Sequence, residues 1–126
     1  MTDYALERDI KLTPDGDIEV SPHGDVVLTG DGLQTLAQHV WLMGVCEPGE
    51  VMMHPEFGCG IPSTLGDPEY ALEVAVATLD WLLATDERLG PGAYDIRTRT
   101  DENGAHVDVE LSPEWAERTE TVNLEG

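Results

Sequence analysis

The sequence predicts an α+β fold in which a small antiparallel sheet packs against two helices. Two segments of the 126 residues, 33–43 and 70–84, space their apolar residues as amphipathic helices do. Two later segments, 94–99 and 106–111, alternate apolar and polar residues as strands do. A segment rich in Gly, Pro and Asp, 14–28, predicts a further short hairpin near the start of the chain. We therefore expect a sheet built from an N-terminal hairpin and a C-terminal hairpin.

The N-terminal hairpin is predicted from a short internal repeat. Residues 14–20 read Pro-Asp-Gly-Asp-Ile-Glu-Val, and residues 22–28 read Pro-His-Gly-Asp-Val-Val-Leu. Each copy suits a turn that enters a brief strand, and residues 21–24 suit the turn that connects them. The Asp and Gly residues do not have the twelve-residue ligand spacing of a calcium loop, so we interpret them as turn residues.

The first helix is expected over residues 33–43, with Asp31 as its N-cap. Its apolar residues share one face, which predicts a buried stripe: Leu33, Leu36, Ala37, Val40, and either Met43 or Gly44. His39 lies off this stripe, and we interpret it as a solvated helix residue.

The second helix is expected to start near Asp67 and Pro68, which suit a cap and a first turn. Residues 70–84 are apolar over more than half of the helix circumference. Such a helix is either central to the core or covered by a partner chain. Residues 85–89 end the helix, and the Gly-Pro-Gly sequence of 90–92 prevents its continuation.

The two C-terminal strands place Tyr94, Ile96 and Thr98 on one face, together with Val107, Val109 and Leu111. The Asp-Glu-Asn-Gly sequence at 101–104 predicts the hairpin turn, and residues 121–124 suit a short edge strand. We expect one domain over 1–126, with extended tails at 1–12 and 113–126 that contact partners.

The charge of the chain is strongly negative, with 26 acidic against 6 basic residues and a net charge of -20. Either a basic partner or adaptation to molar salt, which screens self-repulsion, accounts for such a surface. The acidic residues are spread along the chain, which favours a halophilic origin. Nucleic acid is excluded as a partner because its recognition requires Lys and Arg, and no apolar run is long enough to span a membrane.

Residues 45–61 are the most distinctive stretch and contain the candidates for chemistry. Cys46, His54 and Cys59 do not match the spacing of a zinc motif, so we expect no metal and interpret the cysteines as core residues. No glycine-rich phosphate loop is present, and we expect no cofactor. Glu50 and Glu56 could serve as the carboxylate pair of a small glycoside hydrolase, but one small domain offers little room for a sugar cleft. We therefore expect no catalysis.

The order of several short motifs resembles a known family. Gly16-Asp17-Ile18 or Gly24-Asp25-Val26, then 33–38, then Pro48-Gly49-Glu50 and the sequence Met-His-Pro-Glu-Phe-Gly-Cys-Gly-Ile at 53–61 follow one another at suitable spacing. This series resembles the phage baseplate wedge and sheath-initiator proteins of contractile tails and related injection machines, once described as lysozyme-like. The resemblance covers about residues 9–111. Where the family has Glu-Pro-Arg, this chain has Asp86-Glu87-Arg88, so the proline is missing.

The resemblance implies a structural virion protein of a viral tail baseplate, assembled in the host cytoplasm and present in several copies around the tail axis. Its expected partners are other baseplate and tail proteins: the wedge core, the hub, and the tube or sheath subunits. The expected partner-docking residues are Asp86, Glu87, Arg88, Glu50, Arg97 and Arg99. Arg88 could instead neutralise the end of its helix, and Arg97 and Arg99 could instead balance neighbouring acids. A glycoside hydrolase and a free acidic binding module are the alternative functions.

Overall fold

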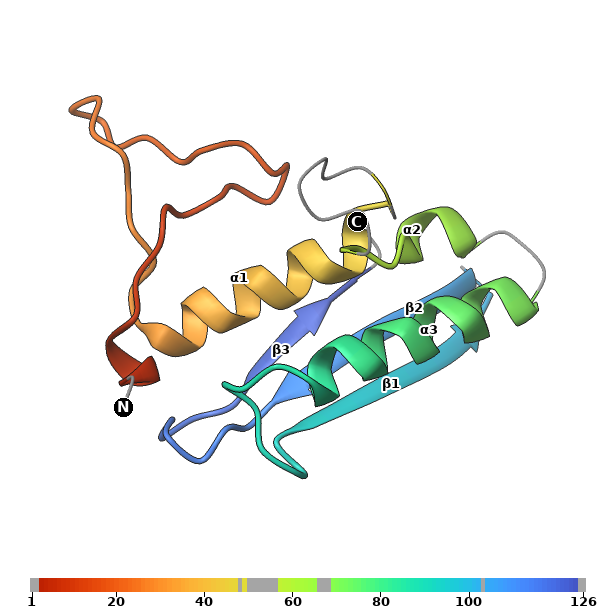
Figure 1. Ribbon diagram of the computed structural model, residues 1–126. Coiled ribbons are helices and arrows are strands. Elements are labelled where there is room, and N and C mark those ends of the chain that lie inside the picture. Colours follow the sequence, from red (N-terminus) through yellow and green to blue (C-terminus); the bar gives the residue numbers. More distant parts are fainter. Residues whose placement is uncertain (1–2, 48, 50–56, 66–68, 103, 125–126) are drawn as a thin grey trace.

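The fold is an α+β arrangement, seen here in a computed structural model that describes residues 3–47, 49, 57–65, 69–102 and 104–124 (Figure 1). Its elements, in chain order, are η1 (Tyr4–Leu6), α1 (Gly32–Val45), α2 (Ile61–Thr64), α3 (Glu69–Ala84), β1 (Tyr94–Asp101), β2 (Gly104–Leu111) and β3 (Glu120–Asn123).

The sheet is antiparallel, with the order β1-β2-β3, so β2 is central. Its register places Ile96 opposite Val109, and Val109 opposite Val122. The apolar side chains of these strands face α1 and α3, which lie over one face of the sheet (Figure 1). The fully buried residues of this core come from both helices and from β2, and include Leu36, Val40, Leu79, Leu83, Val107, Val109 and Leu111.

Both predicted helices and the C-terminal hairpin are confirmed. The side chain of Asp31 caps α1, where it accepts a hydrogen bond from the Gln34 N–H at 2.9 Å. The predicted stripe of α1 is buried, with Gly44 rather than Met43 at its end. The expected start of the second helix, at 67–68, lies outside the described residues. The short C-terminal strand is also confirmed: β3 pairs with β2, and Leu124 beyond it is fully buried.

The predicted N-terminal hairpin is not part of the sheet, in which all three strands are C-terminal. Residues 7–30 instead form an extended segment, here called the N-terminal arm, that lies beside α1 (Figure 1). The arm has three isolated antiparallel pairs: Ile10 with Leu28, Leu12 with Ile18, and Val20 with Val26. Its straight segments are too short to extend a ladder, because a tight turn follows every few residues.

The distinctive central stretch closes a loop onto the C-terminal end of α1. The Cys59 N–H donates to the Met43 carbonyl at 2.9 Å, and the Gly60 N–H donates to the Cys46 carbonyl at 2.9 Å. These bonds satisfy carbonyls that the helix end leaves without intrahelical partners. Cys59 is 6% exposed, and burial raises the pKa of its thiol to about 11, as suits a core cysteine.

Gly58 is required where this loop approaches the helix. Its φ is +103°, and a Cβ at this position would clash with the carbonyl oxygen of Cys46. We therefore expect Gly58→Ala to lower the free energy of unfolding by about 1–3 kcal/mol. Denaturant unfolding of the purified chain measures this loss.

The matched control is Gly90→Ala, because a Cβ at Gly90 would meet nothing within 4 Å. This control is expected to leave stability nearly unchanged. Equal unfolding midpoints for the two variants would show that the loop does not close on α1 as described.

Candidate partner-docking site

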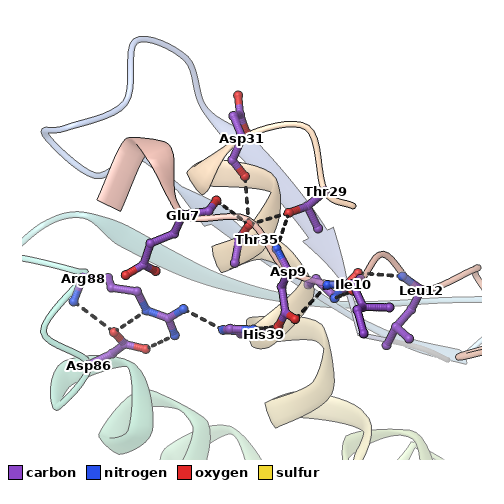
Figure 2. A network of polar contacts seen from close by, with 11 residues as sticks. Glu7, Asp9, Ile10, Leu12, Thr29, Asp31, Thr35, His39, Asp86 and Arg88 are labelled. Atoms are coloured by element: carbon purple, nitrogen blue, oxygen red, sulfur yellow. Dashed lines mark hydrogen bonds and ion pairs between the residues drawn. The ribbon is translucent and has the colours of Figure 1, made fainter. Parts of the chain in front are cut away.

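The expected docking residues Asp86 and Arg88 form a largely enclosed ion pair in the loop that follows α3 (Figure 2). The Arg88 Nε donates to Asp86 Oδ1 at 2.9 Å, and Nη2 donates to Oδ2 at 2.6 Å. The Arg88 backbone N–H also donates to Oδ1, at 3.0 Å. The Arg88 side chain is 14% exposed and the Asp86 side chain is 9% exposed, so this bidentate pair is well shielded from water.

This pair continues into α1 and the N-terminal arm. Arg88 Nη1 lies 2.7 Å from His39 Nδ1, and His39 Nε2 lies 2.9 Å from Asp9 Oδ2 (Figure 2). Because a guanidinium only donates hydrogen bonds, His39 Nδ1 must accept here. Nε2 then carries the proton that is donated to Asp9. We call the chain Asp86–Arg88–His39–Asp9 the polar relay.

The contacts of the relay favour the charged forms of Asp86, Arg88 and Asp9. Burial alone would raise the pKa of Asp86, but the hydrogen bonds and charge of Arg88 outweigh burial and lower it. Burial alone would lower the pKa of Arg88, but the hydrogen bond and charge of Asp86 outweigh it and raise that pKa. The hydrogen bond from His39 lowers the pKa of Asp9.

Further polar contacts attach the arm to the same side of α1. Thr35 Oγ1 lies 2.6 Å from Thr29 Oγ1, and it donates to the Glu7 carbonyl at 2.8 Å. Gln38 bridges the arm backbone: it donates to the Ile10 carbonyl at 2.8 Å and accepts from the Leu12 N–H at 2.9 Å. The arm therefore joins α1 through hydrogen bonds from consecutive helical turns.

Arg88 is therefore a scaffold residue in the isolated chain. The pairing and burial of its guanidinium favour the structural interpretation of this cation over a freely exposed docking contact. The indole of Trp115 also holds the Arg88 backbone, donating to its carbonyl at 2.8 Å. Glu87 between the paired residues is exposed. Glu50 lies outside the described residues.

Arg97 and Arg99 lie on the outer face of the sheet, away from the helices, and each is 62% exposed. Arg97 pairs with Asp95 at 2.9 Å and with Glu110 at 3.4 Å. Arg99 pairs with Asp101 at 3.0 Å. Both arginines balance neighbouring acids within the chain and remain accessible to solvent.

A groove that the sequence did not predict runs between α3 and the edge strand β1, with a volume of about 1390 Å³. Leu72 and Val76 of α3 line one side, and Ile96 and Thr98 of β1 line the other. Two further apolar side chains of α3, Val74 and Trp81, are 63% and 61% exposed. Of the two alternatives for this helix, the first is confirmed, because Ala75, Leu79 and Leu83 are buried in the core. Cover by a partner chain stays a prediction for its exposed side.

The outer edge of β1, which pairs with no other strand among the described residues, carries the backbone of Ile96, Thr98 and Thr100. The Ser112 N–H donates to the Ala93 carbonyl at 2.7 Å, so Ala93 directs its backbone groups toward the second strand. In an antiparallel pair alternate residues do this, so the even-numbered residues of β1 direct theirs outward. Their side chains lie on the groove side, which the alternation of a strand requires.

Of the candidates for chemistry, His54, Glu50 and Glu56 lie outside the described residues, whereas Cys59 is buried and Cys46 is partly buried. Among the residues that the structure describes, no group of three or more His, Cys, Asp or Glu side chains is arranged to hold a metal ion. Within the part of the chain that the structure describes, no helix is long and apolar enough to cross a membrane.

Comparisons with known proteins identify no relative: no family model, no curated protein and no solved structure matches this chain.

The relay predicts a specific effect of removing its buried carboxylate. Asp86→Asn leaves the Arg88 charge enclosed without its anion, so we expect a loss of about 3–5 kcal/mol in the free energy of unfolding at neutral pH. The folded-state pKa of Asp86 is below its ordinary value of 3.8, so the pair stabilises the fold above that pH. That stabilisation is lost as the pH falls through the folded-state pKa, and the two proteins should converge in stability there.

The control is Asp95→Asn, which changes the same Asp-x-Arg spacing at an exposed pair. It should leave the unfolding midpoint unchanged within error, because exposed ion pairs contribute little. Denaturant unfolding at several pH values measures both variants. If the Asp86→Asn protein were as stable as the control at neutral pH, the claim that the enclosed ion pair stabilises the fold would be wrong.

Proposed function

We propose that this protein is a non-catalytic structural subunit of a viral tail baseplate, of the wedge or sheath-initiator kind. It docks other baseplate proteins and connects them to the tube or sheath. The observation that carries the proposal is the outer edge of β1, which no described strand covers, beside a groove of mixed polar and apolar lining. Such an edge accepts a partner strand through backbone hydrogen bonds, while alternate side chains of that strand enter the groove.

The expected docking residues divide into two roles under this proposal. Asp86 and Arg88 hold the loop between α3 and β1 in place. This loop lines one end of the groove, so the pair affects docking indirectly, by fixing the shape of that end. Glu87, Arg97 and Arg99 are exposed and contact partners directly. Arg97 and Arg99 exchange their intrachain carboxylates for those of a neighbouring subunit. Glu50 keeps its proposed docking role through the motif resemblance alone.

The assembly that we propose is a ring of several copies around the tail axis, built in the host cytoplasm and retained in the virion. A charge of -20 suits assembly in a high-salt habitat, where screening limits repulsion between copies. Neither nucleic acid nor a membrane is a proposed partner.

Immunogold electron microscopy of purified particles, with antibody to this chain, tests the location. Label confined to the tail end distal to the capsid supports the baseplate proposal. Protein found in the soluble lysate, with unlabelled particles, contradicts it and directs work to a free binding module or to glycoside hydrolysis.

Strand addition at β1 predicts the effect of proline at Thr98. Because the Thr98 N–H faces the free edge, Thr98→Pro removes an outward donor without removing a hydrogen bond of the sheet. We expect incorporation into particles to fall by roughly tenfold or more. Quantitative immunoblotting of purified particles measures this change.

Thr98→Val keeps the N–H and is the matched control. Circular dichroism and thermal unfolding establish that both variants fold, and Thr100→Pro replaces Thr98→Pro if that variant does not. Normal incorporation of a folded proline variant would contradict docking through this edge.

A further inference from the structure

The N-terminal arm closes on itself as a small three-sided platform. The Lys11 N–H donates to the Val27 carbonyl at 2.8 Å, and the Glu19 N–H donates to the Lys11 carbonyl at 2.9 Å. The Val27 N–H completes the ring by donating to the Glu19 carbonyl at 3.1 Å. These three residues are eight positions apart, so the repeat seen in the sequence is used three times rather than twice.

The corners of the platform repeat the same hydrogen bonds. At each corner a Ser or Thr backbone N–H donates to an aspartate carbonyl, at 2.7, 2.7 and 2.8 Å. The hydroxyl of the same Ser or Thr accepts from the backbone N–H of that aspartate, at 3.2, 3.1 and 3.0 Å. The corner pairs are Thr13 with Asp17, Ser21 with Asp25, and Thr29 with Asp9. The arm is thus a specified structure with approximate threefold symmetry.

One face of this platform is entirely aliphatic. Residues paired directly across two strands place their side chains on the same face, and so do residues two apart along a strand. Applied around the ring, these two rules place six aliphatic side chains together: Ile10, Leu12, Ile18, Val20, Val26 and Leu28.

The aliphatic face is open to solvent over the described part of the chain. Ile10 and Leu28 are 42% and 46% exposed, and Ile18, Val20 and Val26 are 53%, 56% and 50% exposed. Scattered exposed apolar residues are ordinary, but a contiguous group on a built platform marks an interaction surface. About half of each of these five side chains is therefore left in solvent by the fold and is available to a partner.

The arm that carries this face is acidic. Residues 7–30 contain six acidic residues against two basic ones, and one of the bases, Lys11, pairs with Glu19 at 3.5 Å. A second copy of this chain would bring a like charge of -20 to the contact. A partner with basic residues around an apolar patch would bury the same aliphatic surface and gain complementary charge.

We propose that the aliphatic face of the N-terminal arm docks a different protein, one that presents an apolar patch rimmed by Lys and Arg. The platform is fixed before binding, because its own hydrogen bonds and those to α1 set its shape, which limits the entropy lost on association. This surface is separate from the β1 edge, and the proposal holds whether the chain serves in a baseplate or as a free binding module.

Site-specific photo-crosslinking in cells that produce the protein tests this proposal, with a benzophenone side chain at Val20 in the full chain. The expected product joins Val20 to a different protein, and mass spectrometry places the crosslink in an apolar segment flanked by Lys or Arg. A crosslink to a second copy, a crosslink to an acidic segment, or no crosslink would each overturn the proposal.

Two sets of variants separate apolar docking from charge. Ile18→Ser combined with Val26→Ser should reduce the yield of this product by roughly tenfold, because these side chains form the centre of the contact. Leu6→Ser is the control, since Leu6 is an exposed aliphatic residue that lies in η1, outside the arm. Unchanged yield in the double variant would overturn the proposal.

Asp17→Lys combined with Asp25→Lys tests the charge of the partner, because the corner hydrogen bonds at these positions use the backbone groups of the two aspartates. The yield should fall with a basic partner and rise with an acidic one. A rise would overturn the assignment of partner charge. The Thr98→Pro variant leaves this face unchanged. Failure of the arm proposal therefore appears in the crosslinking experiment, whereas failure of the baseplate proposal appears in the particle experiments.

Discussion

The two faces of α1 are the constraint on which the remaining structure depends. Its apolar face packs on the sheet, with Leu36 and Val40 fully buried. Its polar face carries Thr35, Gln38 and His39, which hold the arm and receive Arg88 from the loop after α3 (Figure 2). Hydrophobic burial therefore fixes the core, whereas specific hydrogen bonds fix the parts that lie outside it.

This division explains why so much apolar surface remains open. The helices cover one face of three strands, leaving the groove beside β1, the outward side chains of α3 and the aliphatic face of the arm. None of these surfaces is needed to complete the core. These three surfaces are the ones that our proposals assign to partners, where apolar contact and charge complementarity would operate together.

The sequence predicted the elements whose signals are local. The helical spacing around Leu36, the cap at Asp31 and the alternation in β1 and β2 depend on neighbouring residues, and the structure confirms them. The predicted turn at 21–24 is present, since Val20 pairs with Val26 across it, but the prediction that this segment joins the sheet is wrong. The arm pairs cyclically instead: Ile10 meets Leu28, and no window of a few residues contains both. The eight-residue repeat was visible, but its third copy has Gly30 where the others have proline.

The candidate site was less predictable than the fold because its contacts join residues that are far apart in the sequence. His39 was interpreted as solvated, yet it joins Arg88, 49 positions later, to Asp9, 30 positions earlier. Arg88 was considered for docking and for structure, and its burial favours the second role. The groove depends on where α3 lies relative to β1, which no local pattern specifies. Its one sequence signal is Thr98, a polar residue on the apolar face of its strand.

Amide hydrogen exchange of the free protein, followed by NMR, tests the central claim that the arm is ordered by α1 before any partner binds. We predict slow exchange at Lys11, Glu19 and Val27, whose N–H groups close the ring of the platform. We also predict that His39→Ala accelerates exchange in the arm while the amides of β2 stay protected. Exchange at these three arm amides as fast as in an unstructured peptide would contradict the account.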